Sequence, residues 1–152
     1  MSGTTTVHAS VAFVGDRGVL IRGASGSGKS SLLLALLDRD PEARLVADDR
    51  VVLTDDGERL VASVPDAIAG RMEIRGVGIV RRPHLASAPV DLVVDLVAEA
   101  DAPRLPDADE RTVEVEGLLL PRVFIISGAP DGAVRVRAAL AALFSQDIDI
   151  VE

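Results

Sequence analysis

The sequence predicts an α/β fold that is mostly β sheet with one or two helices. Short apolar segments separated by turn residues recur along most of the chain, which is the pattern of short strands. Apolar residues at helical spacing occur in two places, directly after a glycine-rich loop and again near the C-terminus. The chain has 152 residues, no internal repeat and no long linker, so we expect a single domain over residues 1–152.

The N-terminal region predicts a hairpin followed by a helix. Val7–Val14 and Gly18–Ile21 are apolar segments on either side of Asp16-Arg17-Gly18, so we expect a β-hairpin with its turn there. Lys29–Arg39 carries leucines at helical spacing and is expected to be an amphipathic helix. Asp40-Pro41 ends it, because proline disfavours helix in the residue before it.

The rest of the chain predicts short strands and one further helix. The strands are expected at Leu45–Ala47, Val51–Leu53, Leu60–Val64, Met72–Ile74, Val77–Val80, Asp91–Val97, Thr112–Val115 and Leu118–Ile126. Asp91–Val97 is the most apolar of them and is expected at the centre of the sheet. Pro65–Gly70 is expected to be a connection with one helical turn, Ala100–Arg111 a solvated acidic loop, and Val134–Phe144 the closing helix.

The composition excludes several classes of function. A net charge of −8 argues against non-specific binding to nucleic acid or to a membrane surface. The chain has three Phe and no Trp or Tyr, so we do not expect an aromatic surface on which nucleic-acid bases stack. The absence of Cys excludes disulfides, thiolate metal sites and cysteine nucleophiles. No apolar run approaches the length of a membrane span, and no basic-then-apolar leader opens the chain. We therefore expect a soluble, cytoplasmic domain.

One segment matches a phosphate-binding (Walker A) motif at every fixed position. The motif G-x-x-x-x-G-K-[ST] fits Gly23–Ser30, with a strand before it and a leucine-rich helix after it. Glycines let the backbone approach phosphate oxygens, and the N–H groups of the loop and of the helix N-terminus face the anion. Lys29 reaches the β- and γ-phosphates, and the Ser30 hydroxyl ligates Mg²⁺. We expect a nucleoside triphosphate or a similar polyphosphate to bind at Gly23, Ala24, Ser25, Gly26, Ser27, Gly28, Lys29, Ser30 and Ser31.

Two adjacent carboxylates, Asp48 and Asp49, follow an apolar strand. Beside a phosphate loop with Mg²⁺ bound, one can be a metal ligand and the other can accept a proton from a hydroxyl group. A solvated turn between two strands is an equally good interpretation of the pair. Asp95 is a second candidate for the metal aspartate, because it lies within an apolar strand where many phosphate-loop enzymes place theirs.

Further candidate residues are the carboxylate Glu73, the guanidinium Arg75 and the imidazole His8. The carboxylate can complete a metal shell while the guanidinium holds phosphate in a bidentate contact. A surface ion pair is the more common interpretation of such spacing, and a packed imidazole is the more common interpretation of His8. The role of His84, in a basic loop, stays open.

Taken in order, these residues resemble one family, the C-terminal kinase domain of the HPr kinase/phosphorylases. The matching segments are His8-Ala9-Ser10, Gly18–Ile21, Gly23–Ser30, Leu45–Asp49 and Glu73–Ile79. The last of them looks like the signature segment of that family, and the short distance from phosphate loop to aspartate pair is also typical of it. The similarity covers residues 7–80 well and the remainder loosely.

The resemblance implies a phosphate-loop kinase domain with a fold similar to that of phosphoenolpyruvate carboxykinase. It implies an ATP- and Mg²⁺-dependent protein-serine kinase that transfers the γ-phosphate to a serine of HPr, the small phosphocarrier of the phosphotransferase system, and so regulates that system. Asp48 would be the general base, and His8 would lie beside the transferring phosphate. The other implied roles are phosphate binding by Lys29 and Arg75 and Mg²⁺ binding by Ser30, Asp49 and Glu73.

The sequence also departs from the family pattern. It begins directly at the kinase domain, like the short form found in some proteobacteria. Family members usually carry a basic Pro-Gly-Arg-Asn-like turn before the last helix, whereas Ser127–Ala133 contains no arginine. This absence argues against the phosphate-driven dephosphorylation activity. The long forms are commonly hexamers, and the shortened tail leaves a homo-oligomer open here.

Two other functions fit the same motifs. One is a kinase for another protein or for a small hydroxylated metabolite, and the other is a nucleotide-responsive binding module with little turnover. No aromatic residue marks an adenine pocket, so the preference for ATP follows from the resemblance alone.

Overall fold

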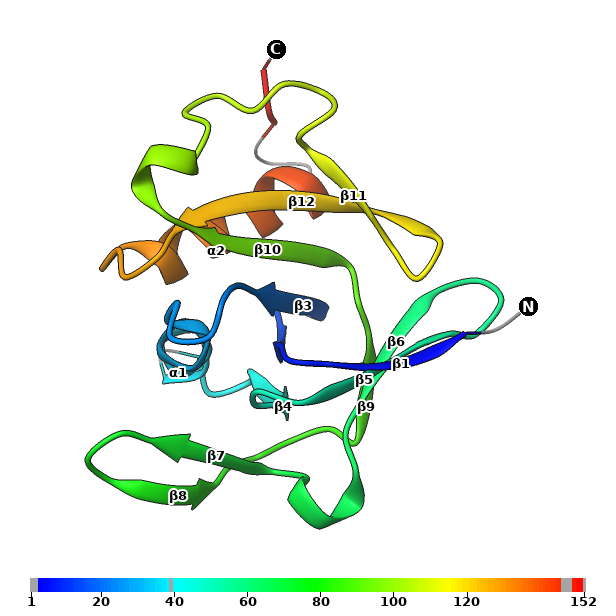
Figure 1. The fold of residues 1–152 in the computed structure, drawn as a ribbon, viewed down its shortest axis with the longest axis vertical. Helices are drawn as coiled ribbons and strands as arrows, with labels where there is room; N and C mark the ends of the chain where they lie inside the picture. The colour runs from blue at the N-terminus through cyan, green and yellow to red at the C-terminus, as the bar shows by residue number, and fades with distance from the viewer. Residues whose placement is uncertain (1–2, 39, 146–148, 152) are drawn as a thin grey trace.

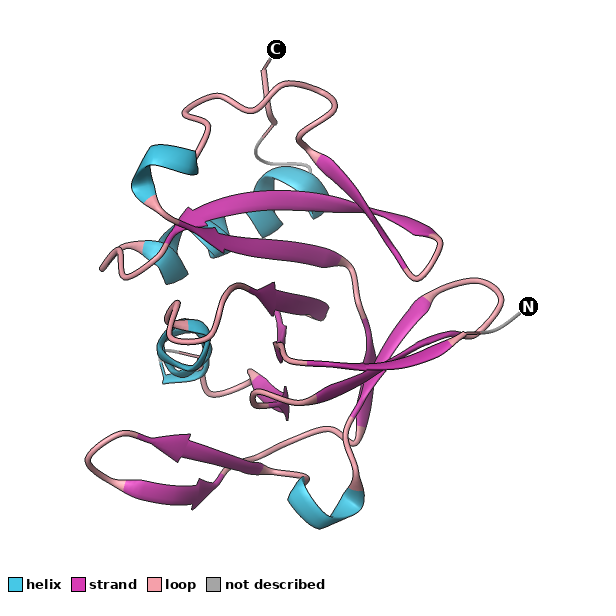
Figure 2. Cartoon of the chain, in the orientation of Figure 1, coloured by secondary structure: helices cyan, strands magenta, loops and turns pink. Residues whose placement is uncertain are grey.

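The computed structural model describes residues 3–38, 40–145 and 149–151, and in them the chain forms three β-sheets and two α-helices. Strands predominate in Figure 2, which confirms the predicted fold class. The hairpin of β7 and β8 lies at one end of the long axis, and the loop before β11 lies at the other (Figure 1). The strands β2, β3, β4 and β10 lie between these ends (Figure 1).

The largest sheet has six strands in the order β11-β12-β10-β3-β2-β4. They are β2 (Ser10–Val14), β3 (Arg17–Arg22), β4 (Arg44–Ala47), β10 (Leu92–Val97), β11 (Thr112–Val115) and β12 (Leu118–Ile126). The three strands β3, β10 and β12 run parallel, and the other pairs are antiparallel. The prediction that the apolar segment ending at Val97 is an interior strand is confirmed, since β10 lies between β3 and β12.

The second sheet has four antiparallel strands in the order β1-β5-β6-β9. They are β1 (Thr4–Val7), β5 (Val51–Asp55), β6 (Leu60–Ser63) and β9 (Ser87–Pro89). A separate hairpin consists of β7 (Arg71–Ile74) and β8 (Gly78–Arg81), and short 3₁₀ turns lie at Asp66–Ile68 and Glu99–Asp101. The expected strands in these regions are confirmed to within two residues, and β9 was not expected.

Two details of the predicted N-terminal hairpin were wrong. The turn consists of Gly15 and Asp16, with φ of 58° and 61°, and Val14 pairs with Arg17. Positive φ at both positions is the geometry of a type I′ turn, which matches the twist of the flanking strands. The strand expected over Val7–Val14 begins only at Ser10, and Val7 instead ends β1, which pairs with β5 in the second sheet.

The six-stranded sheet is covered on both faces, because alternate strand residues point to opposite sides. Ile21 and Val94 belong to a core cluster that includes Leu33 of the first helix. Leu20 and Val93 belong to a second cluster with residues of the four-stranded sheet. The helices therefore cover one face, and the smaller sheet covers the other.

The two helices are α1 (Lys29–Asp38) and α2 (Gly132–Phe144). The predicted helix starting at Lys29 is confirmed, and its expected last residue, Arg39, lies outside the described residues. Arg137 of α2 lies 3.3 Å from Asp40 and also donates to a backbone carbonyl of α1. The backbone N–H of Glu42, followed by Arg137, holds the pKa of Asp40 below its ordinary value. Neither helix in the described part of the chain has the length and apolar character needed to cross a membrane.

Gly18 of β3 is a position where the fold leaves no room for a side chain. A Cβ there would lie 1.8 Å from the backbone carbonyl oxygen of Pro89, which the packed strands cannot move cheaply. We expect Gly18→Ala to lower the free energy of unfolding by about 3 kcal/mol, measured by urea denaturation. Gly3→Ala is the control, since its Cβ would make only an ordinary 3.5 Å contact with Glu116. Equal stability of the two variants would contradict this account.

Candidate active site

The phosphate-loop motif lies between the end of β3 and the start of α1, as its sequence context predicted. Gly26 and Gly28 have φ of 78° and 97°, a left-handed conformation that glycine adopts at little cost. A Cβ on Gly23 would lie 2.4 Å from the Ser27 hydroxyl oxygen and 3.1 Å from Leu96 Cβ, so the loop closes tightly on itself. Its backbone N–H groups lie at the N-terminus of α1, where an anion is favoured.

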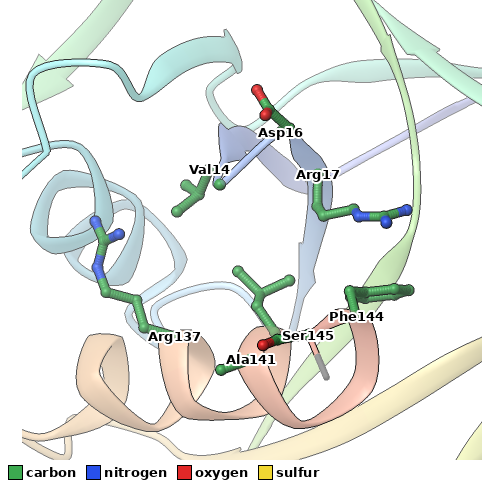
Figure 3. A pocket seen from close by; sticks show the side chains of 9 residues that line it. Val14, Asp16, Arg17, Arg137, Ala141, Phe144 and Ser145 are labelled. Atoms are coloured by element: carbon green, nitrogen blue, oxygen red, sulfur yellow. The ribbon is translucent and has the colours of Figure 1, made fainter. Parts of the chain in front are cut away.

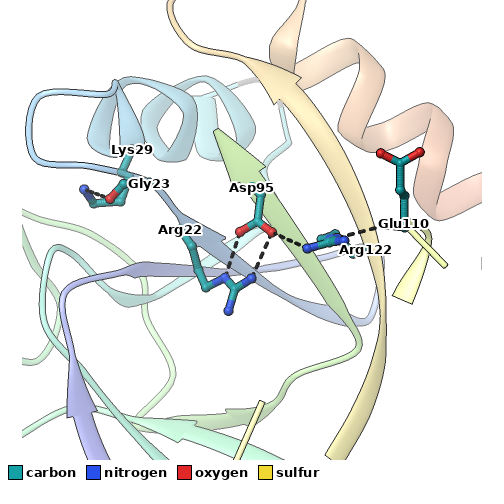
Figure 4. Close-up of polar contacts among 6 residues, drawn as sticks. All are labelled: Arg22, Gly23, Lys29, Asp95, Glu110 and Arg122. Carbon is teal, nitrogen blue, oxygen red and sulfur yellow. Dashed lines mark hydrogen bonds and ion pairs between the residues drawn. The ribbon is translucent and has the colours of Figure 1, made fainter. Parts of the chain in front are cut away.

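Lys29, the first residue of α1, is 7% exposed. Its ammonium group donates to the carbonyl oxygen of Gly23 at 2.9 Å (Figure 4). It also donates to the carbonyl oxygen of Ala24 at 3.0 Å. An ammonium group has three N–H donors, so one is left for a phosphate oxygen. The loop therefore holds a positive charge at the place where the motif requires one.

Asp48, directly after β4, lies against the first turn of α1. Its Oδ1 accepts a hydrogen bond from the Ser30 hydroxyl at 2.7 Å. Its Oδ2 accepts one from the backbone N–H of Glu73 at 3.1 Å. Three segments far apart in the sequence, α1, the end of β4 and β7, therefore meet at one carboxylate. Asp48 therefore faces the phosphate loop, whereas Asp49 is exposed.

The other predicted residues are exposed at the surface. Asp49 and the side chains of Glu73 and Arg75 are exposed, and Arg75 lies in the turn between β7 and β8. His8 is exposed as well and lines a cavity of about 360 Å³ that also contains Gly23 of the loop. His8 thus lines the same cavity as the first glycine of the loop, and the backbone N–H of Glu73 contacts Asp48.

The geometry at Ser30 and Asp48 suits Mg²⁺. In the described residues, no three Asp, Glu or His side chains converge on a common point. Mg²⁺ at nucleotide sites is usually held by one or two carboxylates, substrate phosphates and water, so a three-residue cage is not required. The hydroxyl and carboxylate oxygens of this pair are ligands of the kind that Mg²⁺ prefers. When bound, the cation would draw charge from the terminal phosphates.

The other candidate for the metal aspartate, Asp95, has partners of its own. Its carboxylate accepts from Arg22 at 2.7 and 2.8 Å and lies 3.4 Å from Arg122 of β12 (Figure 4). Two guanidinium groups already satisfy this carboxylate. The metal-facing role is therefore better suited to the carboxylates after β4.

We expect Asp95→Asn to weaken the fold and to spare metal binding. The change leaves Arg22 and Arg122 without a charged partner beside the loop and should lower the free energy of unfolding by about 2 kcal/mol, less than a fully buried pair would lose. The Mg²⁺ dependence of ATP binding, measured by calorimetry, should stay within twofold of the wild-type value. Loss of that dependence would make Asp95 a metal ligand.

A larger cavity of about 430 Å³ lies between the β2–β3 turn and the C-terminal part of α2 (Figure 3). The guanidinium of Arg17 is 4.3 Å from the centre of the Phe144 ring and 3.7 Å from Asp91. Arg137, on the other side, is paired with Asp40. The residues that line this cavity include none of the phosphate loop or of the aspartate pair, so the cavity is separate from the site.

Sequence reasoning missed two contributors. Ser10 of β2 is buried and accepts a hydrogen bond from the Asp49 backbone N–H at 3.2 Å. Ser127 donates a hydrogen bond to the carbonyl oxygen of Ser27 in the phosphate loop. Ser10 belongs to the matching segment His8-Ala9-Ser10 and Ser127 to the turn Ser127–Ala133, but neither pattern indicates a role for its serine.

Together, the loop, its helix and the carboxylate beside Ser30 define a phosphate-loop protein. The family model described as HPr Serine kinase C-terminal domain matches residues 1–125. The chain therefore belongs to this family, as the order of its motifs predicted.

Known proteins agree with this assignment. A protein named HPr kinase/phosphorylase from Geobacillus thermodenitrificans is 38% identical over 133 residues, which are 80% of this chain and 42% of that protein. One of the same name from Bacillus mycoides is 47% identical over 78 residues, or 51% of this chain and 25% of that protein. The chain thus spans less than half of these relatives. The structure of the Hpr(Ser) kinase/phosphatase from Coxiella burnetii matches with a TM-score of 0.76 and 29% identity, covering 90% of this chain and 88% of that one.

Proposed function

We propose that this chain is an ATP- and Mg²⁺-dependent kinase that phosphorylates a serine of HPr. The observation that carries the proposal is the 2.7 Å hydrogen bond between Ser30 of the phosphate loop and Asp48. It places a carboxylate next to the residue that ligates Mg²⁺ in such loops, where the terminal phosphate and an incoming hydroxyl would meet. Membership in the HPr serine kinase family supports HPr as the acceptor.

In this proposal the serine hydroxyl oxygen of HPr forms a bond to the γ-phosphorus. The bond from that phosphorus to the β–γ bridging oxygen breaks, ADP leaves, and Asp48 takes the hydroxyl proton. Lys29 neutralises charge on the β- and γ-phosphates from its position on the loop. His8, at the cavity that contains Gly23, would contact the transferring phosphate.

The remaining assignments concern the exposed residues around Asp48. Asp49, the Glu73 side chain and the Ser30 hydroxyl would face Mg²⁺, and Arg75 would hold phosphate from the β7–β8 turn. The hydrogen bond from Ser30 also allows the reverse assignment, in which Asp48 faces the metal and Asp49 accepts the proton. Separate substitution of the two aspartates distinguishes these assignments, as described in the Discussion.

The test uses the purified chain, ATP labelled on the γ-phosphate, Mg²⁺ and HPr from the same organism. We expect label on one HPr serine, identified by mass spectrometry, and no label on an HPr in which that serine is alanine. Label on other proteins or on small hydroxylated compounds, with none on HPr, would replace this proposal with a different kinase. Tight ATP binding without any transfer would favour a nucleotide-responsive binding module.

A second arm of the same assay tests the reverse direction. The curated relatives are named as phosphorylases as well as kinases. Because the segment Ser127–Ala133 has no arginine, we propose that this chain does not remove phosphate from phosphorylated HPr when inorganic phosphate is added. Release of pyrophosphate in that arm would refute this part of the proposal.

A further inference from the structure

Ser10 is a buried polar residue close to the aspartate pair. It lies in β2 with 0% of its surface exposed. Within the described part of the chain, Ser10 and Lys29 are the polar or charged residues that are buried. A buried hydroxyl is costly unless hydrogen-bonded, so its partners are informative.

The Ser10 hydroxyl contacts both aspartates, once as an acceptor and once as a donor. Its Oγ accepts the backbone N–H of Asp49 at 3.2 Å. It donates to Oδ1 of Asp48 at 3.5 Å, a long contact to the same oxygen that accepts from Ser30. One hydroxyl thus touches the backbone of one aspartate and the side chain of the other.

The backbone around Asp48 is irregular on both sides. Before it, Val11 pairs with Ala47 but Ala12 pairs with Leu45, so the β2–β4 pairing shifts register. After it, Asp49 has φ of 65°, in the left-handed region. Bulges next to active sites turn side chains toward the chemistry, and a left-handed residue other than glycine persists only where its surroundings hold it. The hydrogen bond from Asp49 N–H to Ser10 is such a support.

We propose that Ser10 is a positioning residue that fixes the left-handed conformation of Asp49 and the orientation of Asp48. This inference rests on the proposed kinase function. Ser10 acts through the two aspartates, by contacting the Asp48 carboxylate and the Asp49 backbone, and would not itself contact phosphate or the acceptor hydroxyl. A serine that only filled space in the core would affect stability but would not separate kcat from KM.

The test compares Ser10→Thr with Ser10→Val, because the two side chains have the same shape and differ in the hydroxyl. We expect Ser10→Val to lower kcat for HPr phosphorylation by about tenfold relative to Ser10→Thr, with KM for ATP within twofold. We also expect amide hydrogen exchange at Asp49 to be about tenfold faster in Ser10→Val, with the amides of β10 unchanged. If the extra methyl group prevents folding of both variants, Ser10→Ala against the wild type gives the same comparison.

The two readouts separate this inference from the proposed function. If the wild type phosphorylates HPr but the threonine and valine variants have equal kcat, Ser10 is not a positioning residue. If the wild type does not phosphorylate HPr, the proposed function fails, and the rate of amide hydrogen exchange at Asp49 becomes the only test of the role of Ser10. Equal rates of amide exchange at Asp49 in the two variants would then overturn the role of Ser10. A faster rate in Ser10→Val would support the proposal that Ser10 fixes the conformation of the aspartate pair.

Discussion

Replacing Asp48 with asparagine is expected to lower kcat for phosphoryl transfer by about 10²–10⁴-fold while ATP still binds. Asparagine keeps the shape of the side chain but cannot accept a proton. Its carbonyl oxygen can still accept from the Glu73 N–H, and its amide group can donate to the Ser30 hydroxyl, so the local structure should be retained. Single-turnover kinetics with bound ATP measures the chemical step directly.

Asp49→Asn is the matched comparison for this variant. If Asp48 is the base and Asp49 a metal ligand, Asp49→Asn should raise the Mg²⁺ concentration needed for half-maximal rate, and added Mg²⁺ should restore part of the activity. Asp48→Asn should not be rescued by Mg²⁺. Rescue of Asp48→Asn with no rescue of Asp49→Asn would establish the reverse assignment. Asp95→Asn should leave the rate within a few-fold of the wild-type rate, because the Asp95 carboxylate is held by two arginines and does not face the metal in this account.

Replacing Lys29 with methionine is expected to weaken ATP binding by about 10–100-fold, as the loss of one charged hydrogen bond implies. Methionine retains an apolar stem in the buried position and removes the ammonium group. The carbonyl oxygens of Gly23 and Ala24 lose their donor as well, so the loop should also become less ordered. Calorimetric titration with Mg·ATP measures the loss.

Arginine at the same position is the informative control for Lys29→Met. It restores a positive charge but is larger and planar, and the buried ammonium lies against two carbonyl oxygens with little room. We expect Lys29→Arg to recover only part of the affinity. Unchanged affinity in Lys29→Met would mean that the loop binds phosphate through its backbone alone.

Local features of the fold could be predicted from the sequence. The glycine loop, the leucine helix that starts at Lys29 and the interior strand ending at Val97 are each determined by neighbouring residues, and all three are confirmed. The passage of Thr4–Val7 into a second sheet could not be predicted, because its partner strand starts at Val51. The strand Ser87–Pro89 is too short, and its proline too unusual for a strand, to stand out as a pattern.

The candidate site also has one part that could be predicted from the sequence and one part that could not. A carboxylate beside the phosphate loop followed from the motif order, and Asp48 lies there. Asp95 was the second candidate for the metal aspartate, and its pairing with Arg122 of β12, which is distant in sequence, could not be predicted. Ser10 lies in a segment that resembles the family, but its contacts with the aspartate pair depend on the shifted pairing of β2 with β4, which no local pattern indicates. Interactions across the sheet therefore account for what sequence reasoning missed.

The burial of Lys29 has a chemical consequence because it is the only lysine in the sequence. Every other basic side chain apart from histidine is a guanidinium, which does not react with amine-selective acylating reagents. Such a reagent would find just one side-chain amine in the whole chain, and it lies inside the phosphate loop. Acylation beyond the N-terminal amine would therefore report how often this loop opens.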